Sequence, residues 1–340
     1  MIGIPAQAQT VDLDILRDGQ QARLEATELA LRSPVALREL KIDDLRRAAG
    51  EEAKPTPDFK FKLTAPVFYN SNPDHASSGG SRTFEGNPDL LLKWTKMFGE
   101  AWQFTGAYDA SIDRFGRSVS ADGDSTLVKT RLQWLAHGHD QDLQPSLTFS
   151  ETSNFAPTFA HSISSFHDLA LGFDKMVNYD WKRHRLAPTA LKTSSSTVWS
   201  LGLTGSVVRR IPDQGAPSRF ILNAVPSLTY NLSIDKESPD GTAAQWSLSL
   251  SSLVSRRLYD SQGGNSRRDW YFQPNLTLTY VPPLDCFHGS DPLTQNDVAT
   301  AYGLPNVQFQ VVYSKLRSTV PAKEFQQWQV GPMLLLQWSF

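Results

Sequence analysis

The chain ends in Pro332-Met333-Leu334-Leu335-Leu336-Gln337-Trp338-Ser339-Phe340. Counted back from the last residue, every second residue of this segment is apolar: Phe340, Trp338, Leu336 and Leu334. A period of two residues places these side chains on one face of a β-strand. Because chain ends usually fray in water, an apolar face that continues to the last residue is unusual for a soluble protein.

This segment resembles the last strand of bacterial outer-membrane β-barrels, which ends in Phe with an aromatic residue two positions earlier. The resemblance implies that the strand closes a barrel, and that Leu334, Leu336, Trp338 and Phe340 form the signal read by the barrel-assembly machinery. It also implies a location in the bacterial outer membrane, in contact with outer-membrane lipid, with the N and C termini periplasmic. The resemblance covers roughly residues 58–340 and indicates no narrower family.

The composition is compatible with such a barrel. Hydrophobic residues make up 40% of the chain, the mean hydropathy is −0.36, and no run of 18 apolar residues occurs. We therefore expect no transmembrane helix, whereas apolar residues spaced at period two around a closed sheet can still cross a bilayer. Nine Trp, nine Tyr and 18 Phe are available for aromatic girdles at the membrane surfaces.

Charge and cysteine content exclude several other classes. The net charge of −2 gives no reason to expect a nucleic-acid partner, and the single Cys286 excludes an intrachain disulfide framework. His137-Gly138-His139-Asp140-Gln141-Asp142 contains good metal ligands. Because this segment connects two expected strands, we interpret it as a solvated turn and expect neither a metal ion nor a cofactor.

Alternation of apolar and polar residues predicts twelve strands after residue 57. They cover approximately residues 59–69, 90–95, 102–113, 125–136, 143–149, 168–178, 199–207, 220–233, 246–251, 270–280, 307–314 and 334–340. A soluble β-sandwich would also alternate, but several of these runs exceed the usual length of soluble strands, about five or six residues. We therefore predict an all-β fold, a closed antiparallel up-and-down transmembrane β-barrel with an N-terminal α-helical extension.

Two features modify the expected barrel. Pro66, Pro145, Pro226 and Pro274 fall inside strands, and because each lacks a backbone donor, each predicts a bulge or a weakened pair. The connection 282–306 is long, and Asp291-Pro292 followed by Gly303 predicts a capped short helix within it. With both termini periplasmic, residues 70–87, 115–125 and 152–165 would be extracellular loops.

Residues 11–53 differ from the rest because they lack aromatic residues and interleave acidic with basic ones. The pattern predicts a helix over Leu13–Arg32, weakened by Gly19, and a second helix that starts at Ser33-Pro34 and ends at Gly50. Three interpretations stay open: a periplasmic helical hairpin that binds a partner protein, a helix that plugs the barrel, as in autotransporter translocator barrels, or a loosely ordered leader. We divide the chain into residues 1–55, the leader and helical segment, and 56–340, the barrel.

Ala6-Gln7-Ala8 before Gln9 fits the small-residue site at which a signal peptide is cleaved. The basic and apolar segments that should precede such a site are missing from the sequence. We therefore expect that the given start is truncated within a signal peptide and that the mature chain begins near Gln9. Alternatively, these residues are an ordinary flexible terminus.

The polar face of the strands carries the candidate functional residues, because it would line the lumen. The pore-lining candidates are Lys60, Lys62, Lys93, Lys129, Arg131, Asp109, Asp113, Asp168 and Asp174. Opposed basic and acidic walls favour a channel for small hydrophilic solutes, by passive or facilitated diffusion. Alternatively, the charges pair across a narrow lumen and fill it. The second functional hypothesis is an outer-membrane anchor, assembly or export component whose residues 11–53 recruit a periplasmic protein.

One segment has the spacing of a hydrolase site. Outer-membrane phospholipase A, also a twelve-stranded barrel, sets a His and a Ser two positions apart with an Asn farther along. His75-Ala76-Ser77 and Asn87 are similar in spacing. A nucleophile and its base need a fixed mutual geometry, whereas these residues lie in a Gly/Ser-rich loop. We therefore expect no enzymatic activity.

Overall fold

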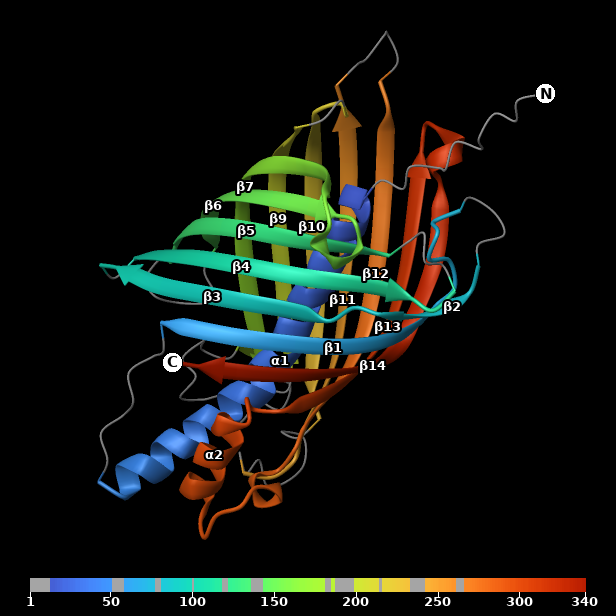
Figure 1. Cartoon of the computed structure of the whole chain (residues 1–340). Helices are drawn as coiled ribbons and strands as arrows, with labels where there is room; N and C mark the ends of the chain where they lie inside the picture. The colour runs from blue at the N-terminus through green and yellow to red at the C-terminus, as the bar shows by residue number, and fades with distance from the viewer. Residues whose placement is uncertain are drawn as a thin grey trace, which may run out of the picture.

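The chain forms a closed antiparallel β-barrel in the computed structural model, with one long helix inside it (Figure 1). The structure describes residues 13–50, 58–76, 81–99, 101–117, 122–135, 143–180, 185–186, 199–213, 216–232, 242–260 and 266–340. Over these residues the wall has twelve strand positions, as the alternation predicted, and neighbours in sequence are neighbours in the wall. No helix in the described part of the chain has the length and apolar character required to cross a bilayer.

The wall consists of long strands of β-barrel type. Their bounds are β1 Phe59–Asn70, β2 Thr83–Gly86, β3 Asp89–Phe98, β4 Trp102–Phe115, β5 Gly123–Trp134, β6 Gln144–Phe155, β7 Ser162–Asp180, β9 Trp199–Pro212, β10 Arg219–Asn231, β11 Gln245–Tyr259, β12 Arg268–Val281, β13 Asn306–Ser318 and β14 Phe325–Ser339. A two-residue β8, Arg185–Leu186, pairs only with the end of β7. β2 and β3 share one wall position, since both pair with β1 on one side and β4 on the other.

The last strand closes the barrel against the first. β14 pairs with β1 from Lys60↔Ser339 to Asn70↔Gln329. Phe59 and Phe340 also exchange backbone hydrogen bonds, Phe59 N to Phe340 O at 3.2 Å and Phe340 N to Phe59 O at 2.9 Å. The chain end is therefore part of the ladder. We call the end of the barrel at Phe340 the C-terminal rim, and the opposite end, where β1 leads to β2 and β13 leads to β14, the far rim.

The apolar face of the strands is the outer face of the barrel. Exposed outward residues include Leu250, Phe272 and Phe309, whereas the neighbouring inward residues Gln308 and Gln310 are fully buried. Aromatic residues gather at both edges of this face, for example Trp246 and Tyr280 near the C-terminal rim and Trp270 and Trp328 near the far rim. About ten residues of β12 separate the two girdles, roughly 33 Å along the strand. At a tilt of about 40° this gives an apolar band about 25 Å tall, as outer-membrane barrels have.

Prolines interrupt the ladder without shifting its register. Pairing of β10 with β11 passes from Ala224↔Val254 to Ser227↔Ser251, skipping Pro226. Pairing of β12 with β13 skips Pro274 in the same way. The predicted weakened pairs are therefore present at these two positions. A register shift occurs elsewhere, between Asn154 and Phe155, where β6 pairs with β7.

The N-terminal segment forms one helix, so the prediction of two helices or a periplasmic hairpin is wrong. α1 spans Leu13–Ala48, 36 residues, and runs unbroken through Ser33-Pro34. It begins inside the barrel near the far rim and leaves through the C-terminal rim, where it meets α2 (Figure 1). Of the three interpretations, the helix that plugs the barrel agrees with this position.

The predicted short helix in the connection 282–306 is confirmed. α2 spans Pro292–Ala301, and the side chain of its N-cap Asp291 accepts hydrogen bonds from the backbone N–H groups of Leu293 and Thr294. α2 packs on the emerging part of α1: Ile42 contacts Leu284 and Ala299 in an apolar cluster. Arg46 pairs with Asp297 at 2.9 Å. The exit of α1 from the barrel is thus fixed by this connection.

Gly303 follows α2 and lies against the ring of Trp338 at the C-terminal rim. Its φ is +85°, and a Cβ there would lie 2.6 Å from the ring of Trp338. We predict that Gly303→Ala destabilises the folded barrel by about 1–3 kcal/mol, since an L side chain pays for both the left-handed backbone and the displaced ring. The measurement is the temperature at which the unboiled, fast-migrating gel band converts to the unfolded one. Gly86→Ala is the control, because nothing lies within 4 Å of a Cβ there.

Candidate functional site: the lumen and its helix

An apolar stripe holds α1 against one side of the lumen. Ile15 is buried in a cluster with Leu253, Tyr271, Leu316 and Phe325, and Ala22 packs at its edge. Between them lies Gly19, one helical turn after Ile15. A Cβ on Gly19 would come within 2.6 Å of the Tyr271 hydroxyl. The glycine that weakens the helix in the sequence is therefore the residue that lets α1 approach the wall closely.

Two carboxylates on the same part of α1 face three arginines of the wall. Asp18 contacts Arg257 of β11 at 2.7 Å and Arg210 of β9 at 2.8 Å. Asp14, one turn earlier, pairs with Arg210 at 3.3 Å and with Arg219 of β10. The three guanidinium groups are almost fully buried, with side-chain exposures of 0–5%. Buried cations of this kind need paired anions, and α1 supplies two of them.

Asp168, one of the predicted pore-lining residues, completes this cluster. It makes a bidentate contact with Arg210, Nε to Oδ1 at 2.8 Å and Nη2 to Oδ2 at 2.6 Å. Three carboxylates thus face three arginines, which balances the charge. We call Asp14, Asp18, Asp168, Arg210, Arg219 and Arg257 the arginine cluster.

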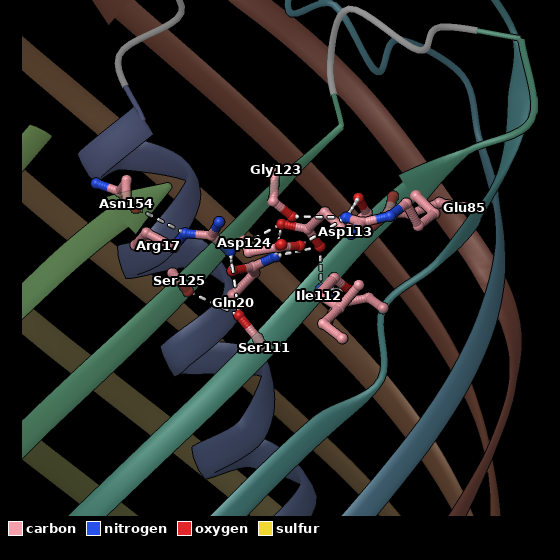
Figure 2. A network of polar contacts seen from close by, with 12 residues as sticks. Arg17, Gln20, Glu85, Ser111, Ile112, Asp113, Gly123, Asp124, Ser125 and Asn154 are labelled. Carbon is pink, nitrogen blue, oxygen red and sulfur yellow. Dashed lines mark hydrogen bonds and ion pairs between the residues drawn. The ribbon is translucent and has the colours of Figure 1, made fainter. Parts of the chain in front are cut away.

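The opposite face of α1 bonds to the other side of the lumen (Figure 2). Arg17 pairs with the predicted Asp113 of β4 at 2.7 Å, and its Nε donates to the Asn154 side chain at 3.0 Å. Gln20 donates to both carboxylate oxygens of Asp113 at 2.8 Å. Ser111 of β4 also accepts from Arg17, at 3.3 Å. At the height of Arg17 and Asp18, α1 is therefore hydrogen-bonded to two opposite sides of the barrel wall.

The next turn of α1 bonds to the break between β2 and β3. Arg23 donates to the Asn87 side chain at 3.0 Å and lies 4.0 Å from the Glu85 carboxylate. Asn87 also donates to Asp113. Asn87, one member of the hydrolase-like spacing, is therefore engaged in the lumen, whereas His75 bonds to Gln327. Ser77 lies outside the described residues, as does the segment His137–Asp142.

Towards the C-terminal rim, α1 presents glutamates to a group of lysines. Glu28 pairs with Lys62 of β1 at 3.1 Å, and Glu25 lies 3.6 Å from Lys129 of β5. Lys93 of β3 lies within the electrostatic reach of Glu28 and of the other lysines. Lys60, one pleat farther along β1, is exposed towards this rim. We call Lys60, Lys62, Lys93 and Lys129 the lysine group.

Among the side chains that the structure describes, the remaining predicted residues make no ion pair with α1. Arg131 and Asp174 pair with each other at 2.5 Å, between β5 and β7, and Gln133 donates to the same carboxylate at 3.1 Å. Asp109 is buried in the wall, within electrostatic reach of Lys62. The predicted basic and acidic walls are thus present, but much of their charge is paired with the helix or within the wall.

Sequence reasoning missed the arginines of the second half of the barrel. The nine pore-lining candidates from the sequence all lie on β1, β3, β4, β5 and β7. Arg210 continues the lumenal positions of β9 after Ser206, and Arg257 continues those of β11 after Ser251 and Ser255. Continuing the alternation along β9 and β11 for four to six more residues towards the far rim would have found both arginines.

Residues 71–76 form the start of the β1–β2 connection at the far rim, next to the apolar cluster. The ring of His75 lies 4.3 Å from that of Phe325, which packs on Ile15. Its Nε2 is 2.6 Å from the Gln327 side-chain oxygen. Burial lowers the pKa of His75 to about 4, although the Gln327 hydrogen bond acts in the opposite direction. The uncharged ring of His75 therefore packs on the apolar cluster that holds the first turns of α1.

No protein-family model matches the chain, and no curated protein matches it. Solved structures with a similar fold include an outer membrane channel from Pseudomonas putida F1, with a TM-score of 0.47 and 11% identity over 84% of this chain and 97% of that one. The beta domain of the Bordetella autotransporter BrkA gives a TM-score of 0.42 and 8% identity over 84% and 100%. The NanC porin gives 0.38 and 8% over 81% and 98%. The closed twelve-stranded antiparallel barrel is shown by the strand pairing of this chain itself, over the described residues.

Asp18 is the residue whose loss should loosen α1 most. Asp18→Asn leaves Arg257 and Arg210 without a shared carboxylate, and removing one member of a buried ion pair costs about 3–5 kcal/mol. We predict faster backbone hydrogen exchange in α1 and faster trypsin cleavage after Arg17 and Arg23, with the barrel still folded. Asp44→Asn is the control, because Asp44 is 71% exposed and its pair with Arg47 is on the surface. Equal exchange rates in both variants would contradict the role of Asp18.

A second prediction concerns the pH dependence of the His75 segment. The pKa of this imidazole is lower when the segment is folded than the ordinary value of about 6.5, so the opened segment binds the proton more readily. The closed form therefore loses stability as the pH falls from about 6.5 towards about 4. NMR titration of the His75 ring should give a midpoint near 4, and opening in acid should disappear in His75→Gln. A midpoint near 6.5 would show that the ring is not buried.

Proposed function

We propose that this protein is an outer-membrane channel for small hydrophilic solutes, with α1 as a plug that narrows the lumen. The barrel fold supports a location in the outer membrane, and we place both rims accordingly, with the C-terminal rim periplasmic. On this proposal Leu334, Leu336, Trp338 and Phe340 serve as the signal for the barrel-assembly machinery.

The observation that carries the proposal is that inward side chains on one side of the barrel are exposed to solvent, whereas those on the other side are buried. On β5 and β7 the inward side chains of Lys129, Arg131 and Asp174 are 25–30% exposed. On β12 and β13, by contrast, inward Thr279 and Gln310 are 0% exposed. Water therefore reaches one side of the lumen, and α1 lies along the other. A wall that is polar and wet on one side is suited to hydrophilic solutes.

α1 closes this aqueous region towards the far rim. There Arg17 reaches β4 while Asp18 reaches β9 and β11, so the helix spans the lumen with buried ion pairs. The side chains of Arg17 and Asp113 are only 10% exposed. Conduction then requires α1 to shift, or solutes to pass along its wet face. The arginine cluster is the contact that such a shift has to break.

The net charge of the wet region predicts its selectivity. The lysine group supplies four cations, whereas Glu25 and Glu28 supply two carboxylates from α1. The wall carboxyls Asp89 and Asp109, which share a hydrogen bond and therefore one proton, add a third negative charge within reach of Lys62. Arg131 and Asp174 cancel each other. The excess of positive charge favours small anionic or dipolar solutes over cations.

Single-channel recording in planar bilayers tests the plug. Asp14→Asn with Asp18→Asn should give larger or more frequent conductance steps than the unaltered chain, because the two changes release α1 from three buried arginines. Asp43→Asn with Asp44→Asn removes the same charge from the part of α1 beyond the barrel and should leave the steps unchanged. If the folded protein conducts in none of these forms, the channel proposal is wrong.

Zero-current potentials across a KCl gradient test the selectivity. Lys129→Glu reverses one charge at a wet position and should shift the permeability ratio towards K⁺ several-fold, with little change in protein stability. Lys96→Glu, at an exposed pair with Asp58 on the C-terminal rim, is the control for charge at the entrance. An equal shift in both variants would locate the selectivity at the rim instead of in the lumen.

The second candidate is an anchor or assembly component whose helix recruits a periplasmic protein. It is favoured by the length of α1, which continues beyond the barrel with exposed Asp44 and Arg47 next to α2. Capture of one defined periplasmic protein that is lost in Asp44→Lys with Arg47→Glu, from a barrel that never conducts, would support this candidate.

A further inference from the structure

Cations gather on the outer face of the barrel at one place near the far rim. They are Arg256 of β11, Arg268 of β12, and Lys315 and Arg317 of β13. All four belong to the outward set, because they share the strand positions of the exposed outward Leu250, Trp270 and Phe309. We call these four residues the basic patch.

The register places the basic patch around one tryptophan. Arg256 pairs across the strands with Trp270, which pairs on its other side with Arg317. Strand spacing puts the Cα atoms of these two arginines about 10 Å apart. Lys315 is opposite Phe272, one pleat nearer the middle of the apolar band, and Arg268 is one pleat nearer the far rim. The patch therefore straddles the edge of the band.

The charges of the basic patch are not neutralised within the described part of the chain. The Arg256 guanidinium lies over the Trp270 ring, 5.1 Å from its centroid, and its buried Nε has no hydrogen-bond partner. Neither Lys315 nor Arg317 makes an ion pair there. The acid on the adjacent turn, Glu324, accepts from the Ser318 backbone at 3.2 Å.

Two other sets of outward charges near the same rim have partners within the protein. Arg209 of β9 makes a bidentate contact with Asp260, at 2.9 and 2.6 Å. On β6 and β7, outward Glu151 and His167 lie together, and His167 also contacts Asp213 at 3.1 Å. Among the described strand residues of the outer face near this rim, cations without an ion pair therefore gather on β11–β13.

We propose that the basic patch binds the phosphorylated headgroup of a membrane lipid, with the acyl chains lying on the apolar surface below it. Phosphate oxygens would accept from Arg256, Lys315 and Arg317, while Trp270 and Phe272 contact the junction between headgroup and chains. A soluble phosphate lacks the chains that would cover Phe272 and Leu276. The site rests on the barrel lying in a membrane, and it is independent of whether the lumen conducts.

The test is retention of lipid by the full chain in phosphatidylcholine nanodiscs that contain lipid A, a bisphosphorylated glycolipid, or its dephosphorylated form. Native mass spectrometry counts the lipid that stays bound. The unaltered chain should prefer the phosphorylated form. Lys315→Gln with Arg317→Gln should weaken its binding about 10- to 30-fold, since each surface cation near an anionic lipid contributes roughly fivefold.

The control, Arg47→Gln with Lys96→Gln, removes the same charge from exposed ion pairs near the opposite rim and should bind lipid A as the unaltered chain does. Equal retention of both lipid forms, or equal retention by test and control variants, overturns the site. Displacement of lipid A by 10 mM inorganic phosphate would overturn the lipid as its occupant. Failure to enter nanodiscs as a heat-modifiable barrel would instead refute the membrane location.

Discussion

The pairing of β1 with β14 is the contact on which the rest of the molecule depends. A sheet in hydrocarbon must satisfy every backbone N–H and C=O group internally, so an open edge is not tolerated. Closure from Lys60↔Ser339 to Asn70↔Gln329 removes both edges at once. It also gives every strand a lipid-facing side and an enclosed side. The alternation of apolar and polar residues in the sequence therefore places apolar side chains outside the barrel and polar side chains inside it.

Enclosure creates the second constraint, because charged side chains on the inner face lose water when the lumen is filled. Arg257 is fully buried, and the carboxylate that its Nη2 reaches among the described residues is Asp18 of α1. The wall and the helix are therefore complementary: α1 would expose Asp14 and Asp18 without the barrel, and the barrel would hold uncompensated arginines without α1. Gly19 adds the geometric condition, since only a residue without a side chain fits against Tyr271.

Much of the wall was predictable from the sequence, and the helix position was not. The period of two residues locates all twelve strands and assigns Lys62, Asp113 and Asp168 to the lumen, because strand geometry fixes the face of each residue. No local signal states that Glu28 lies beside Lys62, since that contact depends on closure of the whole barrel. Ser33-Pro34 has the form of a helix start, yet α1 continues through it. Packing on the wall and on α2 outweighs the local preference of this pair.

Cations on the inner and the outer face of the barrel both need an anionic partner, but the partner differs between the two faces. Inside, Arg210 is neutralised by Asp168 of the wall and by Asp14 and Asp18 of the helix. Outside, the neighbouring strands β11–β13 carry Arg256, Lys315 and Arg317, which make no ion pair with any described residue. A positive charge at the edge of hydrocarbon is costly without an anion, and α1, which supplies carboxylates to the lumen, lies on the inner face of the wall. The remaining source of anions at that depth is the membrane itself, so the lipid completes on the outer surface the pairing that α1 completes in the lumen.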